Sequence, residues 1–204
     1  MSTEFWNERY AGEDLVYGDA PNTFLAASAG HMPKAGLALD LGAGEGRNAL
    51  FLASLGLDTT AVDQSEVGLA KAQRRARDRK LTLHTTVADL NVFDPPLATF
   101  DVISSIFVHL PSPLRSRVLR RLPTWLRPGG VFILESYAPD QIERDTGGPK
   151  DPDMLAPLES ILADLRVGDP SITIIHEALL VREVIEGAHH SGESSVVQMI
   201  AKKA

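Results

Sequence analysis

The segment from Leu39 to Asn48 constrains this chain more than any other part of its sequence. It reads Leu-Asp-Leu-Gly-Ala-Gly-Glu-Gly-Arg-Asn, so a short apolar strand runs into a glycine-rich turn that opens a helix. Such a turn lets a ligand lie against bare backbone at the positive end of a helix. The dinucleotide-binding fingerprint G-x-G-x-x-G would need its third glycine where Arg47 stands. The observed spacing G-x-G-x-G therefore favours a smaller nucleoside ligand over one that carries a diphosphate.

Strand-like and helix-like patterns alternate from about Leu37 onward, which predicts a sheet covered by helices on both faces. The expected strands are 37–41, 59–62, 81–87, 100–107 and 131–137, followed by a hairpin of 172–185 and 194–201. Expected helices span 47–55 and 157–165, and two more begin at caps on Ser65 and Ser112, while 127–130 is expected to be a turn. The predicted fold class is α/β, a doubly wound seven-stranded sheet that is mostly parallel and has a C-terminal antiparallel hairpin strand.

The 204 residues are expected to form one domain. Within it we expect an N-terminal lid over 1–36, a cofactor-binding half over 37–137, and a substrate loop with the C-terminal hairpin over 138–204. The loop 138–152 is longer than most connections, which is typical of binding loops. Because the carboxyl ends of parallel strands meet at one edge of a sheet, five segments are expected to converge on one crevice there.

Composition excludes several classes of function. Twenty basic residues against 27 acidic ones give a formal net charge of −7, which disfavours binding to nucleic acid or to an anionic membrane. The chain has no cysteine, which excludes a disulfide framework, a thiolate nucleophile and a cysteine-ligated metal. The sequence shows no signal-peptide pattern and no apolar run of transmembrane length, so the cytoplasm is the expected location. The oligomeric state stays open between a monomer and a homodimer.

Three acidic residues follow or end strands at the expected binding edge. Asp63 comes 19 residues after Gly44, where a carboxylate can accept both hydroxyl protons of a ribose; alternatively it begins the turn and caps the next helix. Asp89 could accept from the exocyclic amine of an adenine while Leu90 covers the ring. Asp40, just before the first glycine, either faces a ligand's ammonium group or holds the glycine loop by accepting backbone N–H bonds.

These motifs, together with Leu126-Arg127-Pro128-Gly129-Gly130, resemble those of the class I S-adenosylmethionine-dependent methyltransferases. Gly46-Arg47-Asn48 and Val87-Ala88-Asp89-Leu90-Asn91 are closer to the small tellurite-resistance (TehB-like) members, with thiol methyltransferases as a neighbouring group. Many members carry cysteine where Ala43 stands, and both residues are small. The resemblance implies that S-adenosylmethionine is the cofactor and that it is bound by Asp40, Gly42, Ala43, Gly44, Asn48, Asp63, Gln64, Asp89, Leu90 and Ile106.

Methyl transfer from a sulfonium depends mainly on alignment and on the exclusion of water, although a neutral acceptor would benefit from a general base. His109, just past the fourth expected strand, is the catalytic candidate; the alternative is a histidine bonded to backbone at a strand end. Substrate contacts are predicted at Tyr17, Arg47, Tyr137 and His190. Arg47 either steers an anion into the pocket or pairs with a neighbouring acid.

The predicted acceptor is a small molecule, either an oxyanion of the tellurite or selenite type or a thiol. His189 and His190 share the expected hairpin loop and could join His109 in holding a metal, but their spacing is not typical of a metal site, so none is predicted. Two rival functions remain. One is an NAD(P)-dependent oxidoreductase, which also uses a glycine loop and an acidic ribose ligand. The other is a non-catalytic S-adenosylmethionine-binding module that acts through a partner.

Overall fold

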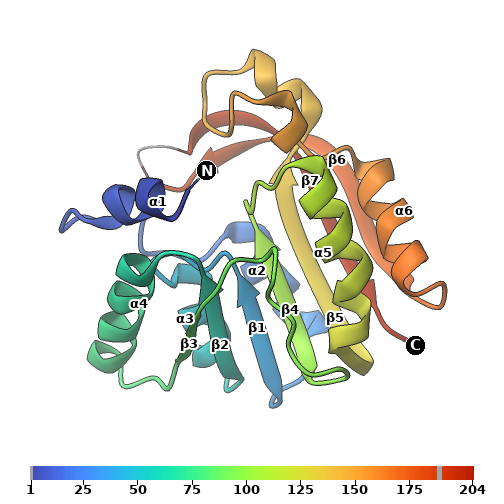
Figure 1. Ribbon diagram of the computed structural model, residues 1–204, viewed down its shortest axis with the longest axis horizontal. Helices are drawn as coiled ribbons and strands as arrows, with labels where there is room; N and C mark the ends of the chain where they lie inside the picture. Colours follow the sequence, from blue (N-terminus) through green and yellow to red (C-terminus); the bar gives the residue numbers. More distant parts are fainter. Residues whose placement is uncertain (1, 188–189) are drawn as a thin grey trace.

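The computed structural model describes residues 2–187 and 190–204, and its centre is a seven-stranded sheet in the order β3-β2-β1-β4-β5-β7-β6 (Figure 1). The strands are β1 (Leu37–Leu41), β2 (Asp58–Asp63), β3 (His84–Val87), β4 (Phe100–Ile106), β5 (Leu126–Tyr137), β6 (Thr173–Ile185) and β7 (Ser191–Lys202). Strands β1 to β5 pair in parallel, whereas β7 lies between β5 and β6 and is antiparallel to both. The predicted α/β fold class, including its reversed C-terminal strand, is confirmed.

Helices cover both faces of the sheet. They are α1 (Thr3–Tyr10), α2 (Thr23–Ala27), α3 (Arg47–Ser54), α4 (Glu66–Asp78), α5 (Ser112–Trp125) and α6 (Leu158–Gly168), with short 3-10 turns η1 (Ser28–His31), η2 (Pro139–Glu143) and η3 (Pro152–Met154). Alternate strand residues face opposite sides, so Phe132 packs with α5 and α6 while Ile133 packs with Leu25 of α2 and Leu52 of α3. Within the part of the chain that is described, no helix has the length and apolar character needed to span a bilayer.

The start of two helices tests the predicted caps. Ser65 is the N-cap of α4, where its hydroxyl accepts a hydrogen bond from the backbone N–H of Gly68 at 3.1 Å, as predicted. Ser112 is not a cap. It is the first residue of α5, and the cap position belongs to Pro111, which makes no side-chain hydrogen bond to the helix.

Two predicted strand boundaries are also wrong. The segment 127–130, expected to be a turn, lies within β5, because the N–H of Gly129 donates to the carbonyl of Lys203 and the N–H of Lys203 donates to the carbonyl of Gly130, both at 2.9 Å. The third strand begins only at His84, because the N–H of Leu81 still closes the end of α4 by donating to the carbonyl of Ala76.

Candidate active site

The glycine loop between β1 and α3 depends on left-handed backbone at Gly42, Gly44 and Gly46, whose φ angles are +61°, +51° and +81°. Residues with a side chain rarely adopt this conformation. Space is also restricted: a Cβ on Gly46 would lie 2.5 Å from the Cβ of Ala72, so this glycine lets the start of α3 approach α4. The glycine pattern therefore sets both the backbone of the loop and the packing of the helix that follows.

Tyr10 of α1 lies directly on this loop. A Cβ on Gly44 would be 2.5 Å from the Tyr10 hydroxyl, and one on Gly68 would be 2.9 Å from its ring. Trp6 stacks on Tyr10 with ring centroids 5.7 Å apart. Tyr10 therefore brings α1, which belongs to the segment 1–36, against the glycine loop.

Asp63 connects the end of β2 to the loop. Its Oδ2 accepts a hydrogen bond from the N–H of Gly44 and its Oδ1 one from the N–H of Ser65, both at 2.8 Å. Burial raises the pKa of this carboxyl, while these two backbone bonds favour its ionised form. Asp63 therefore organises the turn, which is the alternative role considered for it. Each of its carboxylate oxygens has two lone pairs, so Asp63 can still accept hydrogen bonds from a ligand.

Asp40, at the end of β1, keeps one carboxylate oxygen without a partner. Its Oδ1 accepts a hydrogen bond from the Ser104 hydroxyl at 2.6 Å, whereas Oδ2 is buried with no hydrogen-bond partner. Burial raises the pKa of Asp40 to about 7. An unpaired buried polar atom beside a glycine loop is the kind of group that a cationic or protonated ligand would satisfy.

Two further residues assigned to the cofactor, Asn48 and Gln64, lie against the N-terminal segment of the chain. Asn48 is buried, and its Oδ1 accepts the backbone N–H of Asn22 at 2.9 Å. Gln64 is half-buried, with its Oε1 3.3 Å from the hydroxyl of Thr3. Both side chains therefore contact the N-terminal segment, which the sequence did not indicate.

Beyond β3 and β4 the assigned residues differ in exposure. Asp89 is exposed, and its Oδ1 accepts the N–H of Asn91 at 2.7 Å, as in a turn. Leu90 is half-buried and packs against the core, and Ile106 is buried at the end of β4. Asp63 and the glycine loop are thus in direct contact, whereas Asp89 has no contact with them among the hydrogen bonds described.

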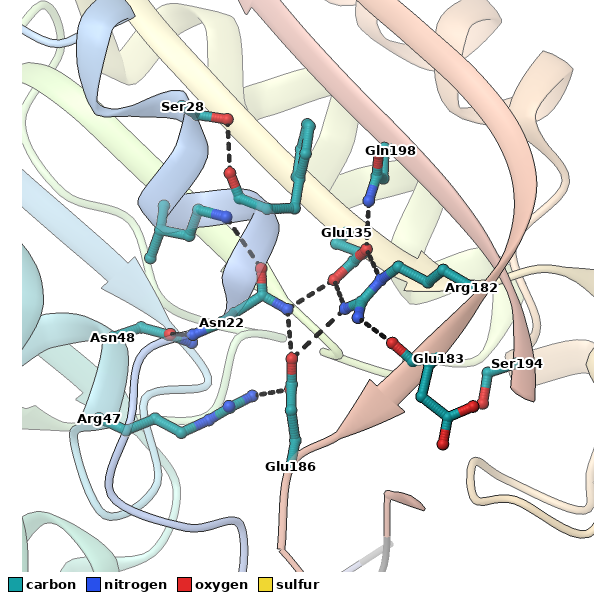
Figure 2. A network of polar contacts seen from close by, with 12 residues as sticks. Asn22, Ser28, Arg47, Asn48, Glu135, Arg182, Glu183, Glu186, Ser194 and Gln198 are labelled. Carbon is teal, nitrogen blue, oxygen red and sulfur yellow. Dashed lines mark hydrogen bonds and ion pairs between the residues drawn. The ribbon is translucent and has the colours of Figure 1, made fainter. Parts of the chain in front are cut away.

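A buried ionic network joins both ends of the chain (Figure 2). It consists of Arg47, Glu135, Arg182 and Glu186, together with the amide of Asn22. Arg182 binds Glu135 through two parallel hydrogen bonds of 2.8 and 2.6 Å, and Arg47 pairs with Glu186. Asn22 donates from Nδ2 to Glu135 at 2.5 Å and to Glu186 at 2.7 Å. Two cations and two anions thus neutralise one another in a buried region, where an unpaired charge would strongly destabilise the fold.

Arg47 therefore pairs with a distant acid, Glu186, which is the second of the two roles we considered for it. Sequence reasoning missed Asn22, Glu135, Arg182 and Glu186. A signal was present for one of them, because Glu135 directly follows the apolar run 131–134 within β5. Asn22 carried no such signal, since its partners lie 113 and 164 residues away.

A cluster of rings lies beside the network, and we call it the aromatic cluster: Tyr17, Phe107, His109, Tyr137 and His190. His109 stacks on Tyr137 with ring centroids 5.4 Å apart and an interplanar angle of 9°. Phe107 lies 4.6 Å from Tyr137, and His190 lies 4.8 Å from Tyr17 and 5.3 Å from Tyr137. Three of the four predicted substrate residues and the predicted base thus meet in one place, while the fourth, Arg47, belongs to the network.

His109 and Tyr137 both stay uncharged near neutral pH. Burial lowers the pKa of His109 to about 4 and raises the pKa of the Tyr137 phenol well above its usual value. A backbone hydrogen bond at Met154 opposes the fall in the pKa of His109, and a side-chain hydrogen bond with Ser194 opposes the rise in the pKa of Tyr137. The alternative of a histidine bonded to backbone therefore stays open beside the role of a base.

Phe107 marks backbone strain at the end of β4. Its φ is +54°, which is unfavourable for a bulky side chain, and its N–H donates to the carbonyl of Glu135 at 2.8 Å. Strained residues of this kind concentrate at functional sites. Of the histidines expected in the hairpin loop, His189 lies outside the described residues. Elsewhere, no three His, Asp or Glu side chains of the described chain come together as a metal site.

The segment that carries the glycine loop matches a known protein family. Residues 38–130 match a family model described as a methyltransferase domain. Residues 38–130 are a methyltransferase domain. This match, with the strand order of the sheet, confirms the resemblance to class I S-adenosylmethionine-dependent methyltransferases predicted from the sequence.

Curated relatives are similar to about half of the chain. The probable S-adenosyl-L-methionine-dependent methyltransferase TehB of Haemophilus influenzae is 40% identical over 98 residues, which cover 47% of this chain and 34% of that protein. Hemagglutinin 1 of Eikenella corrodens is 32% identical over 104 residues, or 48% of this chain and 33% of that protein. The chain spans about a third of the length of the curated relatives it matches.

Solved structures resemble almost the whole chain. A protein studied for the conversion of a disulfide bond into a thioacetal group during echinomycin biosynthesis superposes with a TM-score of 0.74 at 21% identity, covering 98% of this chain and 89% of that one. TehB of Haemophilus influenzae gives a TM-score of 0.69 at 19% identity, covering 99% and 67%. At these identities the likeness is one of fold alone, and it covers almost the whole chain.

Proposed function

We propose that this chain transfers a methyl group from S-adenosylmethionine to a small-molecule acceptor. The observation that carries the proposal is the methyltransferase domain over 38–130, whose left-handed glycine loop is held by Asp63 at the binding edge of the sheet. Open α/β sheets bind ligands at that edge. The likeness of about half of the chain to TehB supports the proposal further.

The residues at this edge fit the cofactor in three respects. Gly42 and Gly44 offer bare left-handed backbone, Asp40 keeps a buried carboxylate oxygen without a partner, and Asp63 retains lone pairs for a ribose. When bound, the cofactor supplies an electrophilic methyl group on a sulfonium. Asn48, Gln64, Asp89, Leu90 and Ile106 complete the proposed cofactor set with Ala43.

The acceptor is proposed to meet the aromatic cluster, with His109 as the general base and Tyr17, Tyr137 and His190 around the acceptor. The TehB likeness supports an oxyanion of the tellurite or selenite type, or a thiol, as candidate acceptors. We also propose the division into a lid over 1–36, a cofactor half over 37–137 and a substrate part over 138–204. Two contacts support it: Tyr10 lies on the glycine loop, and Asn22 joins the lid to the hairpin loop.

Calorimetric titration tests the proposal against its rivals. S-adenosylhomocysteine should bind with a dissociation constant on the order of micromolar, and NAD should not bind. The reverse result would establish the oxidoreductase instead. Turnover of labelled S-adenosylmethionine with a panel of small acceptors then separates an enzyme from a non-catalytic binding module, because the module would bind the cofactor without consuming it.

A further inference from the structure

Residues 11–19 follow α1 and form neither helix nor strand, and we call this segment the strap. No backbone–backbone hydrogen bond among the described residues joins the strap to the sheet or to α4. A cavity of about 530 Å³ separates part of the strap from α4, with Leu15 on one side and Val67 and Lys71 on the other. Apolar packing therefore contributes little to holding the strap against α4, and side-chain contacts hold it instead.

The strap is held by a buried pair of opposite charges, Glu45 and Lys71, which we call the latch. Oε1 of Glu45 accepts a hydrogen bond from Nζ of Lys71 at 2.8 Å, and the two side chains are only 5% and 9% exposed. Oε2 of Glu45 also accepts the N–H of Val16 at 2.8 Å, and Nζ of Lys71 donates to the carbonyl of Asp14 at 3.2 Å. Opening the strap thus breaks two charge-assisted hydrogen bonds, which are stronger than neutral ones.

Glu45 belongs to the glycine loop itself. It lies between the left-handed residues Gly44 and Gly46, and its backbone carbonyl accepts a hydrogen bond from Nη1 of Arg75. The backbone of Glu45 is therefore part of the proposed cofactor bed, while its side chain holds the strap. One residue connects the two.

The strap continues from α1, which lies over the start of α4 (Figure 1). Oδ1 of Asn7 accepts a hydrogen bond from the hydroxyl of Ser65 at 2.7 Å, and the N–H of Ser65 is in turn bound by Asp63. Tyr10, the last residue of α1, lies against Gly44. Atoms of α1 thus flank the proposed ribose ligand Asp63 on two sides, so α1 and the strap lie across the way to the cofactor bed.

We propose that α1 and the strap form the gate for cofactor exchange and that Glu45 is the positioning residue that keeps this gate closed. The inference rests on the proposed methyltransferase function and adds how its cofactor enters and its product leaves. Opening requires Val16 and Asp14 to leave the latch, so the latch sets how often the gate opens. Because a ligand passes the gate in both directions, its association and dissociation rates both follow the frequency of opening.

Surface plasmon resonance with S-adenosylhomocysteine tests the proposal. Glu45→Met removes the acceptor of Val16 but leaves Lys71 without a counter-charge, so the double variant Glu45→Met/Lys71→Met is measured beside it. Both variants should raise the association and dissociation rate constants together by at least about tenfold, the size of one lost hydrogen bond to a charged group. The dissociation constant should stay within about threefold of the wild-type value, since it is the ratio of the two rate constants.

Asp19→Leu is the matched control, because it removes a contact of the strap that is exposed. The side chain of Asp19 is 62% exposed and pairs with Arg75 and Arg79. Exposed pairs contribute little, so both rate constants should change by no more than about threefold. Hydrogen exchange gives a second reading: the amide of Val16 should exchange at least about tenfold faster in Glu45→Met than in the wild type, and far less so in Asp19→Leu.

Three outcomes would overturn the inference. One is unchanged rate constants in both Glu45 variants. Another is faster dissociation with unchanged association, which would make Glu45 a contact of the cofactor and not a latch. The third is an equal effect of Asp19→Leu and the Glu45 variants. If wild-type protein does not bind S-adenosylhomocysteine, the proposed function fails first and the gate with it, and this is seen before any variant is measured.

Discussion

The Oδ2 of Asp63 accepts the backbone N–H of Gly44 at 2.8 Å, across 19 residues of sequence. The same carboxylate accepts the N–H of Ser65, so one side chain fixes both the glycine loop and the start of α4. A residue expected to hold a ribose is thus also part of the frame that shapes the loop, and its two roles can be separated by experiment.

Replacing Asp63 with alanine should lower both stability and cofactor affinity. Two buried N–H groups lose their acceptor, which is expected to lower the free energy of unfolding by about 1–3 kcal/mol. Loss of charge-assisted bonds to the ribose should weaken S-adenosylhomocysteine binding by roughly 1–3 kcal/mol. Urea unfolding and calorimetry measure the two effects. Asp58→Ala, at the exposed start of the same strand, is the control; an Asp63→Ala protein with full cofactor affinity would show that Asp63 does not hold the ribose.

Gly44→Ala should disturb the loop more than an equally strained glycine elsewhere. The left-handed backbone alone is expected to cost about 1–2 kcal/mol with a side chain present, and the new Cβ would also lie 2.5 Å from the Tyr10 hydroxyl. Gly129→Ala shares the positive φ, at +80°, but its Cβ would meet nothing within 4 Å. The difference between the two unfolding free energies isolates the contact with Tyr10. Equal losses of unfolding free energy in the two variants would show that α1 moves away from the new Cβ without loss of stability.

Arg182→Met should be among the most destabilising single changes in the chain. It leaves Glu135 and Glu186 short of a buried counter-charge, and breaking a buried pair in this way typically costs about 3–5 kcal/mol. Arg127→Met removes an exposed pair with Asp101 instead and should cost no more than about 1 kcal/mol. Chemical denaturation compares the two variants. Similar small losses would mean that water reaches the network.

Stability should depend on pH through two opposed groups. The pKa of Asp40 is raised to about 7, so its contribution is full below its unfolded pKa of 3.8 and is lost as pH rises through about 7. The pKa of His109 is lowered to about 4, so its contribution is present above 6.5 and is lost as pH falls through about 4. The two slopes oppose each other between about pH 4 and 6.5 in the wild type.

Single variants reveal each slope in turn. In Asp40→Asn the unfolding free energy should rise more steeply with pH across that window than in the wild type, because the opposing Asp40 term is lost. In His109→Gln it should fall more steeply than in the wild type as pH rises from about 4 to 7, because the opposing His109 term is lost while the raised carboxyls Asp40 and Asp63 remain. Urea titrations at several pH values measure both, and curves parallel to that of the wild type would refute the assignments.

His109→Ala should reduce turnover and leave cofactor affinity intact. Loss of a positioned base is expected to lower kcat by about 10²–10⁴-fold, whereas the side chain makes no contact with the glycine loop among those described. Because the imidazole is already neutral, the wild-type rate should be flat between about pH 6 and 8. His84→Ala, at the exposed opposite edge of the sheet, is the control. Equal loss of turnover and of S-adenosylhomocysteine affinity would place His109 on the cofactor side instead.

Local pattern was enough to predict most of the fold. The bounds of β1 were predicted as they stand, and the capping of α4 by Ser65 followed from a serine placed just before an apolar-periodic segment. The misassigned 127–130 segment shows the limit of such reasoning. A Pro-Gly-Gly sequence favours a turn, yet hydrogen bonds to Lys203, more than 70 residues away, keep it in the sheet.

The same limit of local sequence pattern applies to the candidate site. The glycine loop and Asp63 could be predicted because their chemistry is local and follows a strand. Pairing of Arg47 with Glu186 and of Arg182 with Glu135 could not, because each joins elements that only the folded sheet brings together. The roles of the acceptor-side residues remain predictions that the experiments above address.

Placement of β7 between β5 and β6 has a consequence for synthesis on the ribosome. The strand translated last of the seven is an interior one, so β6 has no neighbour to pair with until β7 emerges. Until β7 is made, Glu135 lacks its hydrogen bond from Gln198, and the edge of β5 that later pairs with β7 can pair with other nascent chains. Long-range pairing of this kind is slow to form and prone to aggregation, so the need for chaperones should be greatest before β7 has left the ribosome.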